Sequence, residues 1–270
     1  MDTERTTHWK RGLMLLALIT AALIGFIGTA EAAPLLGAHR GEQWPGTYTE
    51  DSRLAIQAAI NDPDATFVED DIWLTSDGQG FMLHDATLDR VTNCTGPINA
   101  HPLAWLQANC RFDDGSVPMS AVEYAQMMVA AHKHGWIHVK STTNVSSDEV
   151  VRVMNAVPGS KSYLRLMVRS LNQVTYLRAH MSGAYYEVAT GAPTTAISVA
   201  KVKAAGVRIM VVPAAYTGAA PTSIITPWFG HGLHVDYVTY NHEQDVQAGQ
   251  YPFERVLSGN IPATKTTLGI

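Results

Sequence analysis

Short apolar runs alternate with stretches of helical periodicity along the chain from about residue 35 onward. The apolar runs predict strands, and apolar residues spaced three and four positions apart predict helices between them. Predicted strands lie at residues 35–38, 66–68, 136–139, 164–168, 185–188, 207–212 and 235–240. Predicted helices lie at residues 51–60, 122–132, 146–157, 171–180, 195–205 and 224–229. The pattern amounts to about eight alternations of strand and helix.

Such alternation over about 240 residues indicates a parallel sheet covered by helices. A closed TIM (β/α)8 barrel fits this length better than an open, doubly wound sheet. The first predicted strand leads into GAHRG at residues 37–41, which lacks the glycine spacing of a dinucleotide-binding or phosphate-binding loop. We therefore expect one α/β domain, residues 33–270, folded as a TIM barrel.

Two of the predicted helices carry more specific signals. In the helix at residues 51–60, the apolar residues that we expect to point inward are Leu54, Ala55, Ala58 and Ala59. Ser146 and Glu149 have the spacing of a capping box, in which each side chain bonds the backbone of the other residue. This spacing predicts a helix that begins at Ser146.

The first 32 residues resemble an export signal in composition. Lys10 and Arg11 precede an apolar run that ends near residue 30, and Ala30-Glu31-Ala32 places small residues at the two positions that determine cleavage. We expect residues 1–32 to be a signal peptide and the mature protein to be secreted or periplasmic. The alternative is an uncleaved membrane anchor, because the run reaches the lower limit of about 17 residues for crossing a bilayer.

The charge of the chain bears on its partners. The formal net charge is -5 at pH 7, and the leader holds equal numbers of acidic and basic residues, so the mature chain keeps this value. Tight binding to a nucleic-acid backbone needs clustered Lys and Arg, and the sequence has no such run. We expect no nucleic-acid partner, and the sequence does not indicate an oligomeric state.

Residues 87–117 contain Gly, Pro and Asn with little periodicity, which is typical of a long insertion. We expect a lid or a substrate-binding flap. The segment holds both cysteines of the chain, Cys94 and Cys110. In an exported protein such a pair favours a disulfide, which closes a loop of about 16 residues and contributes about 3 kcal/mol in the chain-entropy model. Two free, buried thiols are the alternative.

Polar residues directly follow three of the apolar runs, and in a barrel such strand ends meet at one mouth. His39 and Arg40 follow the first run, Glu69 and Asp71 follow the second, and His84 follows the run at residues 81–83. Strand alternation sends Glu69 and Asp71 to the same face, where two carboxylates suit a hard divalent cation. A solvated acidic strand end is the alternative. The two histidines could act as an acid and a base.

Taken together, these segments resemble the glycerophosphodiester phosphodiesterase family, whose fold is a TIM barrel of the PLC-like phosphodiesterase type. The family pattern reads HRG, ENT, E-x-D, T-x-D-G and HD followed by L-x-R. This chain has HRG at 39–41, EDS at 50–52, EDD at 69–71, TSDG at 75–78 and HDATLDR at 84–90. The order and the approximate separations agree, and the match thins after about residue 145.

The resemblance implies a role for each matched residue. His39 and His84 would be the general acid and base, Glu69 and Asp71 would be metal ligands, and Arg40 would hold the phosphate oxygens. The implied activity is metal-dependent hydrolysis of a glycerophosphodiester to glycerol 3-phosphate and an alcohol. The implied substrate is a small-molecule or lipid-derived phosphodiester, and the implied cofactor is one divalent ion, calcium or magnesium.

The segment WIHVK at residues 136–140 falls where the family has E-x-K. Lys140 matches as a second phosphate-binding cation, but His138 replaces the glutamate that is the third metal ligand. A neutral imidazole favours softer metals such as manganese or zinc. Three outcomes stay open: His138 binds the metal and changes its identity, the cation binds weakly, or catalysis is lost.

Two other functions are compatible with these motifs. A lysophospholipase D or sphingomyelinase D-like enzyme would need an apolar surface around the barrel mouth and contact with a membrane surface. Phe81, Trp105 and Leu106 are the residues that we expect to form such a surface. A phosphate-ligand binding protein without turnover is the second alternative, and His138 is the residue that favours it.

Overall fold

The computed structural model describes residues 33–43, 46–183, 186–189, 199–212, 228–239 and 242–270. The chain divides into two compact units, Met1–Ala33 and Pro34–Ile270, and the described helices and strands all belong to the second. The predicted signal peptide at residues 1–32 lies outside the described residues. Within the described ranges, no helix combines the length and the apolar character needed to cross a bilayer.

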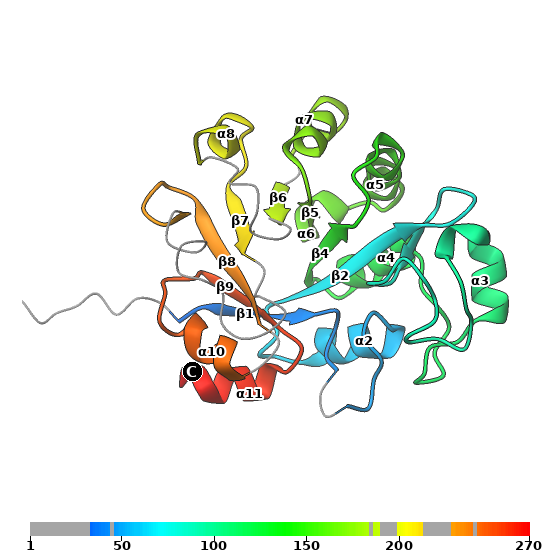
Figure 1. The fold of residues 1–270 in the computed structure, drawn as a ribbon, viewed down its shortest axis with the longest axis horizontal. Coiled ribbons are helices and arrows are strands. Elements are labelled where there is room, and N and C mark those ends of the chain that lie inside the picture. The colour runs from blue at the N-terminus through cyan, green and yellow to red at the C-terminus, as the bar shows by residue number, and fades with distance from the viewer. Residues whose placement is uncertain (1–32, 44–45, 184–185, 190–198, 213–227, 240–241) are drawn as a thin grey trace, which may run out of the picture. The chain divides into compact units, whose positions relative to one another are not determined.

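The described elements alternate between strand and helix for most of the chain (Figure 1). The strands are β1 (Leu35–His39), β2 (Phe67–Leu74), β3 (Gly80–Met82), β4 (His134–Val139), β5 (Leu164–Val168), β6 (Tyr186–Ala189), β7 (Ile209–Val212), β8 (His234–Thr239) and β9 (Arg255–Ser258). The helices are α2 (Arg53–Asn61), η1 (Ile98–Ala100), α3 (Leu103–Asn109), α4 (Ala121–Ala130), α5 (Asn144–Ala156), α6 (Ser160–Tyr163), α7 (Leu171–His180), α8 (Val199–Ala204), α10 (His242–Ala248) and α11 (Ile261–Leu268).

The parallel strands close into a barrel. β1 pairs with β9 on one side and with β2 on the other, so the order β1-β2-β4-β5-β6-β7-β8-β9 returns to its start. β3 adds to the end of β2 in the antiparallel direction. The helices lie outside the strands in Figure 1. The predicted TIM (β/α)8 barrel is therefore confirmed, since parallel strands with outer helices and full closure define that fold.

The interior of the barrel has an apolar floor below a polar mouth. Phe67 and Trp136 stack there with ring centroids 4.2 Å apart, and they share one cluster with Met167, Val211, Val238 and Leu257. Steps of two residues along the same face of β2 lead from Phe67 to Glu69 and then to Asp71. A larger apolar cluster fills the layer between the strands and the helices. The inner face of β2 thus contributes Phe67 to the apolar floor and Glu69 and Asp71 to the polar mouth.

The predicted start of the helix near residue 146 is wrong. α5 is capped by Thr143, whose side chain accepts from the amide of Ser146. Glu149 lies inside the helix and accepts from the backbone amide of Gly80 at 2.6 Å, so it ties α5 to β3. The capping box of the chain is instead at α4, between Ser120 and Glu123. Local spacing could not show that Glu149 has a distant partner.

Two further differences concern helices. In α2, Leu54 is 41% exposed, while Ala55, Ile56 and Ala59 face the core, so the predicted inclusion of Leu54 in the buried face is wrong. β9, α10 and α11 have no counterpart among the predicted elements, because the C-terminal segment lacks clear periodicity. The predicted helix at residues 224–229 lies mostly outside the described residues.

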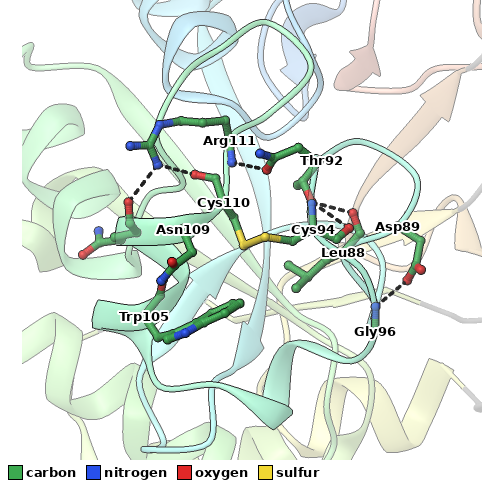
Figure 2. Close-up of a disulfide and its surroundings, with 11 residues drawn as sticks. Leu88, Asp89, Thr92, Cys94, Gly96, Trp105, Asn109, Cys110 and Arg111 are labelled. Atoms are coloured by element: carbon green, nitrogen blue, oxygen red, sulfur yellow. Dashed lines mark hydrogen bonds between the residues drawn. A yellow bond between two sulfur atoms is a disulfide. The ribbon is translucent and has the colours of Figure 1, made fainter.

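The insertion at residues 87–117 is a structured segment with its own small core. Leu88, Ile98, Leu106 and Phe112 pack there with neighbouring apolar residues against Phe81. The predicted disulfide between Cys94 and Cys110 is present, and Figure 2 shows it beside Trp105 and Leu88. The role of the segment as a lid or flap remains a prediction.

We expect the double substitution Cys94→Ala with Cys110→Ala to lower the free energy of unfolding by about 3 kcal/mol. The reason is that the disulfide reduces the conformational entropy of the unfolded chain. Urea unfolding followed by far-UV circular dichroism measures this loss. Reduction of the wild-type protein should produce a similar loss. An unchanged transition midpoint would mean that the apolar cluster alone holds the insertion.

Candidate active site

The ends of three strands bring the predicted site residues together. Register pairs His39 of β1 with Glu69 of β2, and Asp71 of β2 with His138 of β4. Glu69 and Asp71 are each only 1% exposed. Lys140 directly follows β4, and its Nζ lies 3.2 Å from Oδ1 of Asp71. The prediction that Glu69 and Asp71 share one face is confirmed, because both contact the residues of neighbouring strands at the mouth.

Glu69, Asp71 and His138 form a group that can hold a metal ion, since each offers a ligand atom and these atoms lie within 4.8 Å of one another. Oε1 of Glu69 and Nε2 of His138 are buried and have no hydrogen-bond partner in the described part of the chain. The two carboxylate oxygens of Asp71 make ion-pair contacts with His138, Lys140 and Arg40. Buried polar atoms normally have partners. These atoms therefore fit a divalent cation, which carboxylates and imidazole bind well.

The two carboxylates respond differently to their surroundings. Burial together with the negative charge of Asp71 raises the pKa of Glu69 well above its usual value. Burial also favours the neutral form of Asp71, but His138, Lys140 and Arg40 outweigh it and lower the pKa of Asp71 well below its usual value. Oδ1 of Asp71 lies 2.8 Å from Nδ1 of His138. Asp71 is thus the fixed negative charge of the site.

A strained turn after β1 places Arg40. Its φ angle is 60°, in the left-handed region, and Gly41 follows with φ of 78°. A Cβ atom at Gly41 would lie 2.7 Å from the backbone carbon of Ala55, so only glycine fits. The turn leaves the Arg40 Nε 3.4 Å from Oδ2 of Asp71. A second cation therefore lies at the carboxylate pair.

The two histidines lie beside this group. His39 is 7% exposed, and its Nε2 lies 3.8 Å from Oε2 of Glu69. Burial and the charge of Arg40 lower the pKa of His39 well below its usual value. Burial also lowers the pKa of His84. Both rings are consequently neutral near pH 7 and can accept a proton.

Four residues that had no predicted role connect the site. Nη1 of Arg40 donates to the Glu50 carboxylate at 3.2 Å, and Arg90 pairs with the same carboxylate. Nε of Arg90 also donates to Asp85 at 2.5 Å, and Asp85 lies 2.7 Å from Nδ1 of His84. The fourth residue is Asp51, which accepts from the backbone amide of His84 at 2.8 Å.

This chain of ion pairs also explains the charge state of Asp85. The hydrogen bond from Arg90 is the main reason that the pKa of Asp85 is lowered to about 2. An ionised Asp85 accepts from Nδ1 of His84 and leaves Nε2 as the nitrogen that can accept a proton. All four residues, Glu50, Asp51, Asp85 and Arg90, fall within the sequence motifs, so the motifs already marked them as candidates. The motifs do not show which of these residues contact one another.

Two residues predicted to form an apolar surface at the mouth do not do so. Phe81 and Leu106 are fully buried within the core of the insertion. Trp105 is 39% exposed and stacks on His101. The prediction for Phe81 and Leu106 is wrong, because the insertion uses them to pack against itself.

The fold and the site define a closed α/β barrel in which a group able to hold a cation lies beside two histidines and two basic residues. Residues 39–179, just over half of the chain, match the Glycerophosphoryl diester phosphodiesterase family. The chain belongs to this family. It is 30% identical over 118 residues to the Glycerophosphodiester phosphodiesterase of Bacillus subtilis (strain 168), a match that spans 40% of this chain and 38% of the length of that relative.

Solved structures agree in fold. A phosphodiesterase from Oleispira antarctica, solved in complex with the product sn-glycerol-3-phosphate, has a TM-score of 0.72 at 17% identity and covers 88% of this chain and 98% of its own. A glycerophosphodiester phosphodiesterase from Agrobacterium tumefaciens str. C58 has a TM-score of 0.68 at 17% identity, with 86% of this chain and 99% of its own covered. These likenesses support the barrel assignment over most of the chain.

We expect Asp71→Asn to weaken binding of a divalent ion by at least about tenfold, because the site loses its fixed negative charge. Isothermal titration calorimetry with Mn²⁺ on the metal-stripped protein measures the change. Asp148→Asn is the matched control, since Asp148 is exposed on α5 and bonds Tyr176. Equal affinity of Asp71→Asn and wild type would show that the ion binds elsewhere.

Proposed function

We propose that this protein is a metal-dependent phosphodiesterase that hydrolyses glycerophosphodiesters to glycerol 3-phosphate and an alcohol. The observation that carries the proposal is the arrangement at the mouth. There, ligand atoms of Glu69, Asp71 and His138 lie within 4.8 Å of one another, beside two histidines and two basic residues. Membership of the family supports the reaction class. The product bound to the Oleispira antarctica structure supports glycerol 3-phosphate as the product here.

The basic residues position the phosphate. Arg40 and Lys140 both approach Asp71, so their charges converge on one point at the mouth. There they bind the phosphate oxygens and stabilise the negative charge that increases as the bond to the leaving alcohol breaks. A divalent ion held by Glu69, Asp71 and His138 would supply Lewis-acid polarisation of the same oxygens.

His39 and His84 transfer the protons of the reaction in this proposal. One neutral imidazole takes a proton from the nucleophile, either water or the neighbouring glycerol hydroxyl, as its oxygen bonds to phosphorus. The other imidazole, in its protonated form, gives a proton to the oxygen of the departing alcohol as that P–O bond breaks. A bound phosphate brings negative charge beside both rings, which raises the pKa of a histidine and favours the protonated form.

His138 sets the choice of metal in this proposal. It contributes a neutral imidazole, whose nitrogen is a better ligand for manganese or zinc than for calcium or magnesium. Its pKa is lowered by burial, so the ring is neutral and available near pH 7. We therefore propose manganese or zinc in this site.

We also propose that the protein is exported, with cleavage after Ala32. Basic residues, an apolar run and small residues at the cleavage positions support a signal peptide. The disulfide between Cys94 and Cys110 supports an oxidising compartment, because cytosolic thiols are kept reduced. The mature chain is then secreted or periplasmic, and an uncleaved leader would instead tether it to the membrane.

Purified mature protein should release glycerol 3-phosphate from glycerophosphocholine only when a divalent ion is restored to the metal-stripped enzyme. His39→Ala and His84→Ala should each lower kcat by roughly 10²–10⁴-fold, because each removes one proton transfer. His180→Ala on the exposed end of α7 is the control and should retain activity. Binding of glycerol 3-phosphate without turnover under any metal would favour the binding-protein alternative.

A second test exchanges the metal ligand that departs from the family pattern. His138→Glu adds a negative charge and an oxygen ligand, so the activity ratio of calcium over manganese should rise by at least about tenfold. Steady-state rates at saturating substrate with each ion give the ratio. An unchanged ratio would show that His138 does not contact the metal.

A further inference from the structure

A groove of about 580 Å³ runs beside the candidate active site and has no assigned role. It is bordered by the end of β2, the turn after it, part of the insertion and the first turn of α5. Its lining includes Trp73, Pro97, Ile98, Ser141 and Val145. The volume falls within the range of about 300–1,000 Å³ that is typical of small-molecule sites.

Several residues that line the groove are close in sequence to the catalytic residues. Trp73 lies two positions after Asp71 on β2, so both side chains point to the same face of the strand. The indole Nε1 of Trp73 donates to the carbonyl of His84 at 2.9 Å. Ser141, which also lines the groove, directly follows Lys140. These neighbouring positions put the groove next to the proposed phosphate-binding residues.

The two cavities at the mouth differ in chemistry. A second cavity of about 420 Å³ lies on the β1 and β9 side and is lined by charged and polar residues, among them Glu50, Asp245 and Asn260. The described residues that line the groove include no acidic or basic side chain. The polar cavity suits the hydroxyl groups of a polyol, and the groove suits an uncharged group.

Val145 indicates that the uncharged group is apolar. Its side chain is 60% exposed, although valine is usually buried, and it lies on the groove wall at the start of α5. Trp73 adds an aromatic surface to the lining. A choline-like cation would gain from a carboxylate or an aromatic cage, and the described lining offers one tryptophan and no carboxylate.

We propose that this groove binds the leaving alcohol of the phosphodiester and that the preferred alcohol is uncharged, with an apolar chain of several carbon atoms. This inference rests on the proposed function. Burial of each methylene against Trp73 and Val145 contributes binding that a short or cationic alcohol cannot obtain. The groove thereby determines which glycerophosphodiester is the preferred substrate.

The test compares the ethyl and n-hexyl esters of glycerol 3-phosphate, which release the same phosphomonoester. The wild-type enzyme should favour the hexyl ester in kcat/KM by at least about tenfold. Val145→Asp should reduce this ratio to near unity. The substitution should not unfold α5, because an aspartate in the first turn of a helix is favourable.

Leu54→Asp is the matched control. Leu54 is exposed and occupies the same position relative to the cap of α2 as Val145 does in α5, and it lies away from the groove lining. It should keep the hexyl preference of the wild type. Equal kcat/KM for both esters in the wild type, or an unchanged ratio in Val145→Asp, would overturn the inference.

Calorimetry separates this inference from the proposed function. If neither ester is turned over, the proposed function fails, but binding of the two esters still reports on the groove. Tighter binding of the hexyl ester to wild type, lost in Val145→Asp and kept in Leu54→Asp, would support the groove as a site for an apolar group. Equal binding of both esters would reject it.

Discussion

Two carboxylates buried at the mouth of a barrel are stable as charges only when cations surround them. Removing an ion from water costs several kcal/mol, and a second carboxylate nearby adds repulsion. Asp71 obtains its charge compensation from Lys140 and Arg40, and His138 adds a close contact from β4. The register of β1, β2 and β4 creates these contacts, so the closure of the barrel and the charge balance of the site depend on the same pairing.

This balance extends from the barrel into the insertion. Arg90 belongs to the inserted segment, and it joins Glu50 and Asp85, which in turn contact Arg40 and His84. The insertion therefore supplies a cation, Arg90, whose contact with Asp85 orients His84. Its small apolar core and its disulfide hold that cation in place.

Two chemically distinct cavities lie near the group of Glu69, Asp71 and His138, which is able to hold a cation. One cavity is lined by charged and polar residues, and the other is an uncharged groove with exposed apolar surface. A phosphodiester has the same asymmetry when its two alcohols differ. The arrangement gives the protein a physical basis for orienting its substrate as well as for cleaving it.

The sequence alone determined the barrel and most of the site. Regular alternation of apolar runs and helical periodicity requires a covered parallel sheet, and the spacing of Glu69 and Asp71 puts both on one face. The disulfide was predicted from an even pair of cysteines in a chain that we expected to be exported, and the structure contains it. These features depend on residues that are close in sequence, so the sequence alone is enough to predict them.

Only the tertiary structure decided which distant residues meet. Glu149 fits a local capping box, yet it bonds Gly80, and Phe81 and Leu106 are apolar near the mouth, yet they pack within the insertion. The pairing of Arg90 with Glu50 and the groove beside Trp73 likewise join segments far apart in sequence. Such contacts depend on the closure of the barrel and on the path of the insertion. Neither can be derived from the spacing of residues along the sequence.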